Sequence, residues 1–177
     1  FIMSKILLIY KSRTGFTQKY AEMIAKNIQC DIYPFSELRK VSLSNYDTIV
    51  FGSRVHAGII DSFSKVKKIA KDSNLKLVLF ATGATTNESI EIIEGVWKSN
   101  LSPEELQSVP HFYMQSGMNY EKMGFMDRTI MKLMSKMIEK NADSSGDSSK
   151  DQMAITMSHD ISSEEYIKPL VEYVKGM

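Results

Sequence analysis

The chain has 177 residues, of which 43% are hydrophobic and 24% charged, and its formal net charge is +1. This length predicts one domain spanning residues 1–177, and the composition excludes disordered and membrane-protein classes. The balanced charge gives no reason to expect nucleic-acid binding. Because the chain has one cysteine, Cys30, and no apolar stretch long enough to span a bilayer, we expect a cytoplasmic protein.

Apolar runs typical of buried strands recur along the first two thirds of the chain. The runs at 5–10, 47–53 and 76–81 are almost wholly apolar, as in strands that a parallel sheet buries on both faces. Shorter runs at 30–35 and 111–114 predict two further strands.

Between these strands, apolar residues recur at helical spacing. They predict helices at about 16–29, 61–72 and 88–99, and a last helix at about 162–175. Strands that alternate with helices imply right-handed crossovers. The predicted fold class is therefore α/β, a doubly wound five-stranded parallel sheet with helices on both faces. Such sheets bind ligands outside the carboxyl ends of their strands.

The stretch that follows the first strand is rich in hydroxyl groups. Ser12, Thr14 and Thr17 surround Gly15 where the strand gives way to a helix. The first N–H groups of a helix lack intrahelical partners and carry the positive end of its dipole, so this stretch can bind a phosphate. The same residues can instead form an ordinary N-cap. Two other polar, glycine-containing loops follow later strands at the same edge, which favours the anion site.

The residues of this first loop distinguish between families of doubly wound proteins. A nicotinamide-binding fingerprint needs three glycines and a P-loop needs G-x-x-x-x-G-K-[ST], whereas this loop has only Gly15. A receiver domain needs acidic residues at the end of the first strand, and a cysteine phosphatase needs a cysteine in the loop. The chain has neither there. The order of Ser12, Thr14, Gly15 and Thr17 resembles the (S/T)-x-T-G-x-T loop of flavodoxins, which wraps the phosphate of FMN.

The resemblance to flavodoxins implies FMN as the cofactor and three loops as its site. The first loop would hold the phosphate, and the loops at 53–58 and 82–87 would flank the isoalloxazine ring. In flavodoxins a peptide bond of the second loop turns over on reduction, and Ala57-Gly58 is the expected place for this, because glycine makes the second conformer accessible. The cofactor-binding residues implied are Ser12, Arg13, Thr14, Gly15, Phe16 and Thr17, then Ser53, Arg54, Val55, His56, Ala57 and Gly58, then Thr82, Gly83, Ala84, Thr85 and Thr86.

The chain departs from typical flavodoxins in two respects. Neither ring loop supplies an aromatic residue to stack on the flavin, so His56 or a residue of the later insert would have to cover it. Flavodoxins are strongly acidic, which suits docking on basic partners, whereas this chain is balanced. We predict no metal ligand and name no catalytic residue, and His56 is the one acid–base candidate worth testing.

Residues 117–152 form an insert that a minimal flavodoxin lacks. Within it, 123–140 carries a methionine-rich apolar stripe beside lysines, which predicts a helix that packs on the domain, binds a flat apolar partner or lies at a membrane surface. The stretch 127–137 looks like the insert of flavodoxin-type protoporphyrinogen oxidases, which are menaquinone-dependent dehydrogenases at the inner face of the bacterial membrane. The loop at 52–58 is similar to theirs, but it has Ala57 where they tend to carry an aromatic residue.

These resemblances imply an FMN-dependent oxidoreductase that takes electrons from an organic donor such as a porphyrinogen and passes them to a quinone or an electron-transfer protein. Two alternatives remain open. One is a non-catalytic electron carrier with the same cofactor, which turnover assays with menaquinone would separate from an enzyme. The other is an interaction module without FMN, which would be colourless. The expected location is the cytoplasm, with contact to the inner membrane face through 123–140.

Overall fold

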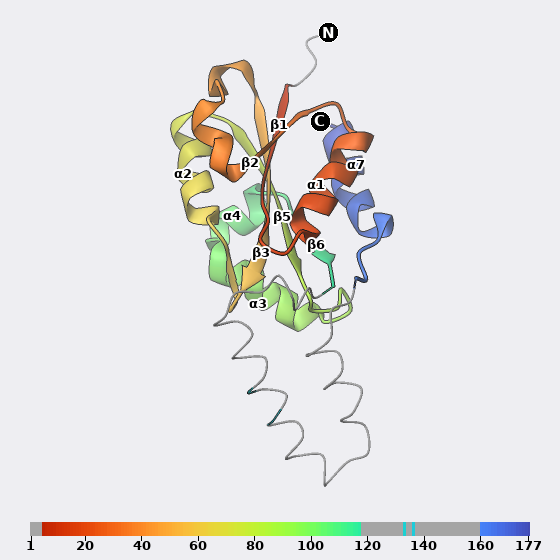
Figure 1. Cartoon of the computed structure of the whole chain (residues 1–177). Coiled ribbons are helices and arrows are strands. Elements are labelled where there is room, and N and C mark those ends of the chain that lie inside the picture. The colour runs from red at the N-terminus through yellow and green to blue at the C-terminus, as the bar shows by residue number, and fades with distance from the viewer. Residues whose placement is uncertain (1–4, 118–132, 134–135, 137–159) are drawn as a thin grey trace. The chain divides into compact units, whose positions relative to one another are not determined.

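The computed structural model describes residues 5–117, 133, 136 and 160–177 (Figure 1). The chain divides into two units, one of Phe1–Ser116 with Ser162–Met177 and one of Gly117–Ile161. Almost all of the predicted insert, including most of the expected helix at 123–140, lies outside the described residues. Among the described residues, no helix has both the length and the apolar character needed to cross a membrane.

A parallel sheet forms the centre of the first unit. Five strands lie in the order β2-β1-β3-β5-β6, and a short strand, β4, pairs antiparallel with β3. The predicted doubly wound five-stranded parallel sheet is therefore confirmed, with β4 as an addition. The strands are β1 (Ile6–Lys11), β2 (Asp31–Pro34), β3 (Thr48–His56), β4 (Ile59–Ile60), β5 (Lys76–Gly83) and β6 (His111–Gln115).

Helices cover both faces of this sheet (Figure 1). α1 and α7 pack on one face, and α2 and α3 pack on the other, as the right-handed crossovers require. The helices are α1 (Phe16–Asn27), α2 (Phe63–Asp72), α3 (Ile90–Asn100), α4 (Pro103–Ser108) and α7 (Lys168–Lys175), with 3-10 segments η1 (Phe35–Lys40), η2 (Leu43–Asn45) and η5 (Glu164–Ile167).

The core consists of two apolar clusters, one on each face of the sheet. Successive side chains of a strand point to opposite faces. Leu8 and Val50 thus pack toward α1 and α7, while Leu7 and Phe51 pack toward α2 and α3. All four side chains are fully buried. Burial on both faces is the physical reason that β1, β3 and β5 read as continuous apolar runs.

The structure differs from the sequence-based prediction in the second ring loop and on the third helix. Residues 54–56, expected as loop, continue β3, and Val55 and His56 pair with β4, so the loop reduces to a two-residue turn at Ala57-Gly58. The spacing of Ile90 matches the apolar residues of the predicted third helix, but Ile90 is 65% exposed because it lies in the first turn of α3.

Helix α4 was not predicted, because six residues are too few to show an apolar period. Its start nevertheless follows a known local rule. The Ser102 hydroxyl oxygen accepts a hydrogen bond from the Glu105 N–H at 3.2 Å, and Pro103 occupies the first turn.

Candidate functional site

The carboxyl ends of β1, β3 and β5 lie side by side at one edge of the sheet. Lys11 is opposite Ser53, and Arg54 is opposite Thr82, so the three predicted loops begin at neighbouring strand ends. The parallel register alone is responsible for this grouping. The expectation that these loops share one edge is thereby met for the described residues.

The first loop leaves the start of α1 uncapped by any side chain. Gly15, at φ +100°, is the N-cap residue, and its N–H donates to the Ser12 hydroxyl at 3.1 Å. The first helical bond is from the Lys19 N–H to the Gly15 carbonyl at 3.0 Å. Among the described residues, no acceptor reaches the N–H groups of 16–18, and the first turn contains no acidic residue. These donors are therefore available to an anion, and the ordinary side-chain cap does not form.

The other residues of the first loop differ in exposure. Thr14 is half-buried, and its hydroxyl makes no hydrogen bond within the described ranges, which leaves it free to bind a ligand. Arg13 is exposed and Phe16 half-buried. A Cβ built on Gly15 would meet no atom within 4 Å, so the positive φ, rather than lack of space, requires glycine here.

Thr17 joins the first loop to the third. It is 2% exposed, and its hydroxyl lies 2.8 Å from the hydroxyl of Thr82, which is 1% exposed at the end of β5. This buried bond positions the N-terminus of α1 against β5.

We expect Thr17→Val to lower the free energy of unfolding by about 1–3 kcal/mol, because it leaves the Thr82 hydroxyl buried without a partner. The double variant Thr17→Val/Thr82→Val removes both hydroxyls and should recover most of that loss. Urea unfolding of the two variants would measure this difference. A double variant that is destabilised by the sum of the losses in the two single variants would contradict a direct bond between these hydroxyls.

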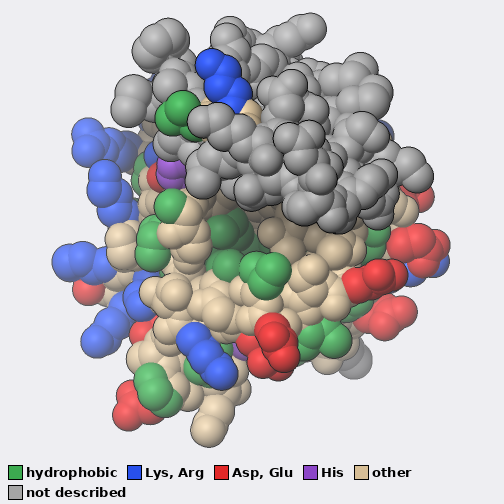
Figure 2. All heavy atoms as spheres, turned by 90° about the horizontal axis from the view of Figure 1, so that it is seen from below, with side chains coloured by type: hydrophobic (Ala, Val, Ile, Leu, Met, Phe, Trp, Pro, Cys, Tyr) green, Lys and Arg blue, Asp and Glu red, His purple; other side chains and the backbone are tan. Residues whose placement is uncertain are grey.

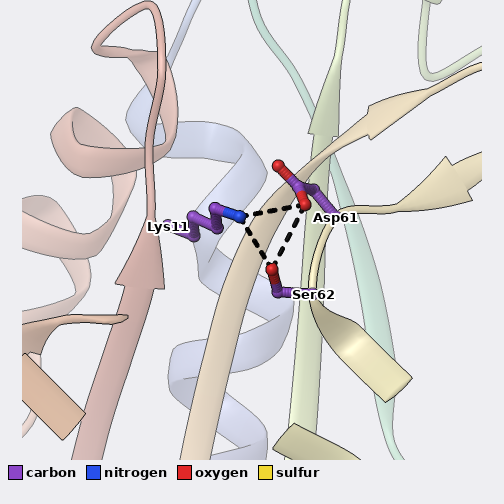
Figure 3. Close-up of polar contacts among 3 residues, drawn as sticks. All are labelled: Lys11, Asp61 and Ser62. Atoms are coloured by element: carbon purple, nitrogen blue, oxygen red, sulfur yellow. Dashed lines mark hydrogen bonds and ion pairs between the residues drawn. The ribbon is translucent and has the colours of Figure 1, made fainter. Parts of the chain in front are cut away.

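A lysine at the end of β1 links the first loop to the start of α2, and the sequence analysis did not identify it. The Lys11 ammonium donates to Asp61 Oδ1 at 3.1 Å and to the Ser62 hydroxyl at 2.8 Å (Figure 3). Ser62 has a left-handed backbone, at φ +61°, and its hydroxyl donates to Asp61 Oδ1. Burial alone would raise the pKa of Asp61, but the hydrogen bonds and positive charges of Lys11, Ser62 and Arg54 outweigh it and lower that pKa. Asp61 therefore stays ionised, and its charge is paired with that of Lys11.

The second loop is a tight hairpin turn between β3 and β4. Ala57 has φ +49° and Gly58 φ +79°, as in the two-residue turns that match the twist of paired strands. His56 and Ala57 are exposed, whereas Arg54, Val55 and Gly58 are half-buried.

Ser53 differs from the rest of this predicted group, because its side chain is fully buried at the end of β3. Its hydroxyl oxygen has no hydrogen-bond partner in the part of the chain that the structure describes. A bound group could reach Ser53 through the backbone or after a change of its rotamer.

The third loop is held in place by β6. The Tyr113 hydroxyl donates to the Thr85 carbonyl oxygen at 2.8 Å. The Gln115 N–H donates to Asn87 Oδ1 at 2.8 Å, and the Asn87 N–H donates in return to Gln115 Oε1. Burial raises the pKa of Tyr113 to about 12, so this donor keeps its proton across the physiological range.

A Cβ on Gly83 would lie 2.8 Å from the same Tyr113 oxygen, so glycine lets the two strands approach. Of the other predicted residues, Ala84 and Thr86 are exposed.

The supporting residues that sequence reasoning missed carry little local signal. Tyr113 and Gln115 read as ordinary strand residues, and Lys11 and Asp61 are separated by 50 positions. The one usable signal was Asn87 in a polar loop, because asparagine side chains often bond nearby backbone in turns.

A groove of about 900 Å³ lies at the opposite edge of the sheet, near the amino ends of β5 and β6. Lys67 and Lys68 contribute to its lining, but Lys67 pairs with Glu105 at 2.9 Å and Lys68 with Asp72 at 2.6 Å. Because doubly wound sheets bind ligands at the carboxyl edge, we place the candidate site there and not in this groove.

Cys30 does not belong to the site. Burial and the neighbouring Asp31 raise the pKa of its thiol to about 11. Since the thiolate is the reactive form, we expect Cys30 at pH 8 to react with a disulfide reagent about 100-fold more slowly than an exposed thiol. The rate should continue to rise above pH 9, and a plateau below pH 9 would contradict the raised pKa.

The comparisons with known proteins agree with this architecture. A family model described as a flavodoxin domain matches residues 7–145. An uncharacterised protein of Methanocaldococcus jannaschii is 36% identical over 81 residues, which cover 44% of this chain and 53% of that protein. The match therefore spans about half the length of that curated relative.

The solved structures that resemble the chain include two flavoproteins. A flavoprotein from Lactobacillus acidophilus in complex with FMN is 18% identical, with 63% of this chain and 92% of that chain covered and a TM-score of 0.44. A WrbA-like flavodoxin from Agrobacterium tumefaciens is 17% identical, with 62% and 83% covered and a TM-score of 0.41.

Proposed function

The chain belongs to the flavodoxin family, and from that premise we propose that it binds FMN at the carboxyl edge of its sheet and works in electron transfer. The observation that carries this proposal is the uncapped start of α1. Gly15 opens the backbone at φ +100°, and the N–H groups of 16–18 have no acceptor among the described residues. Oriented backbone donors at a helix N-terminus are the chemistry that a phosphate monoester requires.

The side chains around these donors fit the same ligand. The Thr14 hydroxyl is available, and Ser12 already holds the loop through the Gly15 N–H. Asp61, which comes just before α2, is paired with Lys11 at 3.1 Å, and this ion pair offsets its negative charge. Donors without a competing negative charge favour a dianionic phosphate over a neutral group.

The ring of FMN would lie between the second and third loops. Figure 2 looks at the molecule from the side of the carboxyl edge; among the described residues, Lys and Arg lie mainly at the left and acidic side chains mainly at the right, with largely uncharged surface between them. A flat, largely apolar ring suits a surface of this kind. The Tyr113 and Asn87 bonds hold the third loop, so it is arranged before any ligand binds.

Bound FMN would supply one- and two-electron transfer, while the protein binds it and adjusts its potential. In this proposal the first loop orients the cofactor by its phosphate. The Ala57-Gly58 turn offers backbone groups to the ring edge. The bond between Thr17 and Thr82 holds the first and third loops in fixed positions relative to each other. No side chain of the described site is assigned a proton-transfer role, and His56 is exposed.

For the reaction, we propose an FMN-dependent oxidoreductase related to the protoporphyrinogen oxidases, with a quinone or a protein as acceptor and a cytoplasmic location at the inner membrane face. The support is the likeness of 52–58 and 127–137 to those enzymes, and all of the second stretch except residues 133 and 136 lies outside the described residues. The electron carrier and the FMN-free interaction module remain the alternatives.

Two measurements test this function in order. The purified chain should be yellow, or become so with added FMN, and acid should release FMN from it. A chain that takes up no FMN would overturn the proposal and leave the interaction module. If FMN binds, protoporphyrinogen and other two-electron donors should be oxidised with menaquinone present. Failure with every donor would leave the electron carrier.

A further inference from the structure

Asn100, the last residue of α3, contacts the turn of the second loop from 42 positions away. Its side-chain nitrogen donates to the Gly58 carbonyl oxygen at 2.9 Å and to the Val96 carbonyl oxygen at 2.7 Å. Its side-chain oxygen accepts from the Ile60 N–H at 2.9 Å. One amide therefore bonds both the turn and the strand that follows it.

The orientation of this amide follows from its partners. Two of them are carbonyl oxygens, which only accept, and the third is an N–H, which only donates. The NH₂ group of Asn100 must therefore face Gly58 and Val96. Aspartate has the same shape but no donor, so at this position it would keep only the bond from Ile60.

The two peptide groups of the turn consequently differ in freedom. The Gly58–Ile59 peptide is held through its carbonyl by Asn100, and Ile60 is anchored in the core at 1% exposure. The Ala57–Gly58 peptide makes no hydrogen bond within the part of the chain that the structure describes. The clamp thus leaves one peptide of the turn able to reorient.

We propose that Asn100 is a positioning residue for the flavin site, which confines reorientation of the hairpin to the Ala57–Gly58 peptide and so helps to set the reduction potential of bound FMN. This inference rests on the proposed function. Without the clamp the turn has more conformers, and the Ala57 carbonyl is offered to the reduced ring a smaller fraction of the time. Binding of reduced FMN should weaken more than binding of oxidised FMN.

The chain offers a matched control in Asn27. Like Asn100 it is the last residue of its helix, and its side-chain nitrogen donates to the carbonyl four residues back, Met23, at 2.8 Å. Its side chain makes no other hydrogen bond within the described ranges. Substitutions at Asn27 therefore repeat the change at a helix end without touching the hairpin.

The test is the midpoint potential of bound FMN in the variants Asn100→Asp, Asn100→Ala, Asn27→Asp and Asn27→Ala. Both Asn100 variants should weaken binding of reduced relative to oxidised FMN about tenfold, which lowers the two-electron midpoint by about 30 mV. Both Asn27 variants should keep the wild-type potential. In the FMN-free protein, the Ile60 amide should exchange faster only in Asn100→Ala.

Each other outcome overturns the inference in an identifiable way. A shift of the midpoint potential in Asn100→Asp but not in Asn100→Ala would be the effect of the added negative charge. Equal shifts in the Asn27 variants would be a general effect of replacing asparagine at a helix end. Wild-type potentials in both Asn100 variants would refute the positioning role and leave FMN binding intact. If Asn100→Asp does not fold, the two alanine variants decide. If the wild-type chain binds no FMN, the proposed function fails and this inference fails with it.

Discussion

Replacing Thr14 with valine should weaken FMN binding about 10- to 100-fold. Thr14 is half-buried in the first loop, and its hydroxyl is without a partner among the described residues, so the substitution removes a donor to the phosphate without breaking a bond of the fold. Hydrogen bonds to charged groups contribute about 1.5–3 kcal/mol, which corresponds to this loss of affinity. Fluorescence titration of the FMN-free protein would measure the dissociation constant.

Two comparisons isolate the phosphate contact. Riboflavin has the same ring without the phosphate, so its affinity should change little in Thr14→Val. Thr14→Ser keeps the hydroxyl and should bind FMN nearly as the wild type does. Equal losses for FMN and riboflavin would mean that Thr14 contacts another part of the ligand and that the phosphate lies elsewhere.

Gly52→Ala should destabilise the fold by at least about 3 kcal/mol. Gly52 lies in β3 opposite Phe80 of β5, and a Cβ built on it would be 1.8 Å from Phe80 Cζ. Phe80 is fully buried, so its ring cannot turn out into solvent to relieve this contact. Chemical denaturation would show either a large drop in the unfolding midpoint or loss of folded protein.

Matched variants identify the cause as this contact. Phe80→Leu shortens the opposing side chain, so Gly52→Ala/Phe80→Leu should be less destabilised than the sum of the single variants. Gly95→Ala, at an exposed position inside α3 with no atom within 4 Å of a new Cβ, should stabilise the protein by about 0.5–1 kcal/mol. A fully folded and stable Gly52→Ala variant would contradict the packing described here.

The central elements of the fold could be predicted from local sequence pattern, and the same pattern placed the candidate site at the carboxyl edge. Continuous apolar runs identify β1, β3 and β5 because a parallel sheet buries both faces of these strands. The order of Ser12, Thr14, Gly15 and Thr17 identified the family, and the family model supports it. Short elements such as α4 and β4 escaped prediction because they are too short to show a period.

The second loop shows why site detail could not be predicted. A glycine after a polar run indicates a turn, but it does not say how far the preceding strand continues. β3 extends to His56 only because β4 is available as an antiparallel partner, and that pairing depends on Ile60 being buried in the core. The sequence analysis therefore treated as a loop what is a hairpin.

The sequence by itself determined the strand and helix pattern and the family of the chain, and it predicted a phosphate-binding first loop at the carboxyl edge of the sheet. These follow from periodicity and from residue types within a few positions of one another. Only the tertiary structure decided that Thr17 bonds Thr82, that Tyr113 holds Thr85 and that Asn100 clamps Gly58. Each of these bonds joins residues 28 or more positions apart, and packing of the folded chain is what brings their polar atoms within 3 Å.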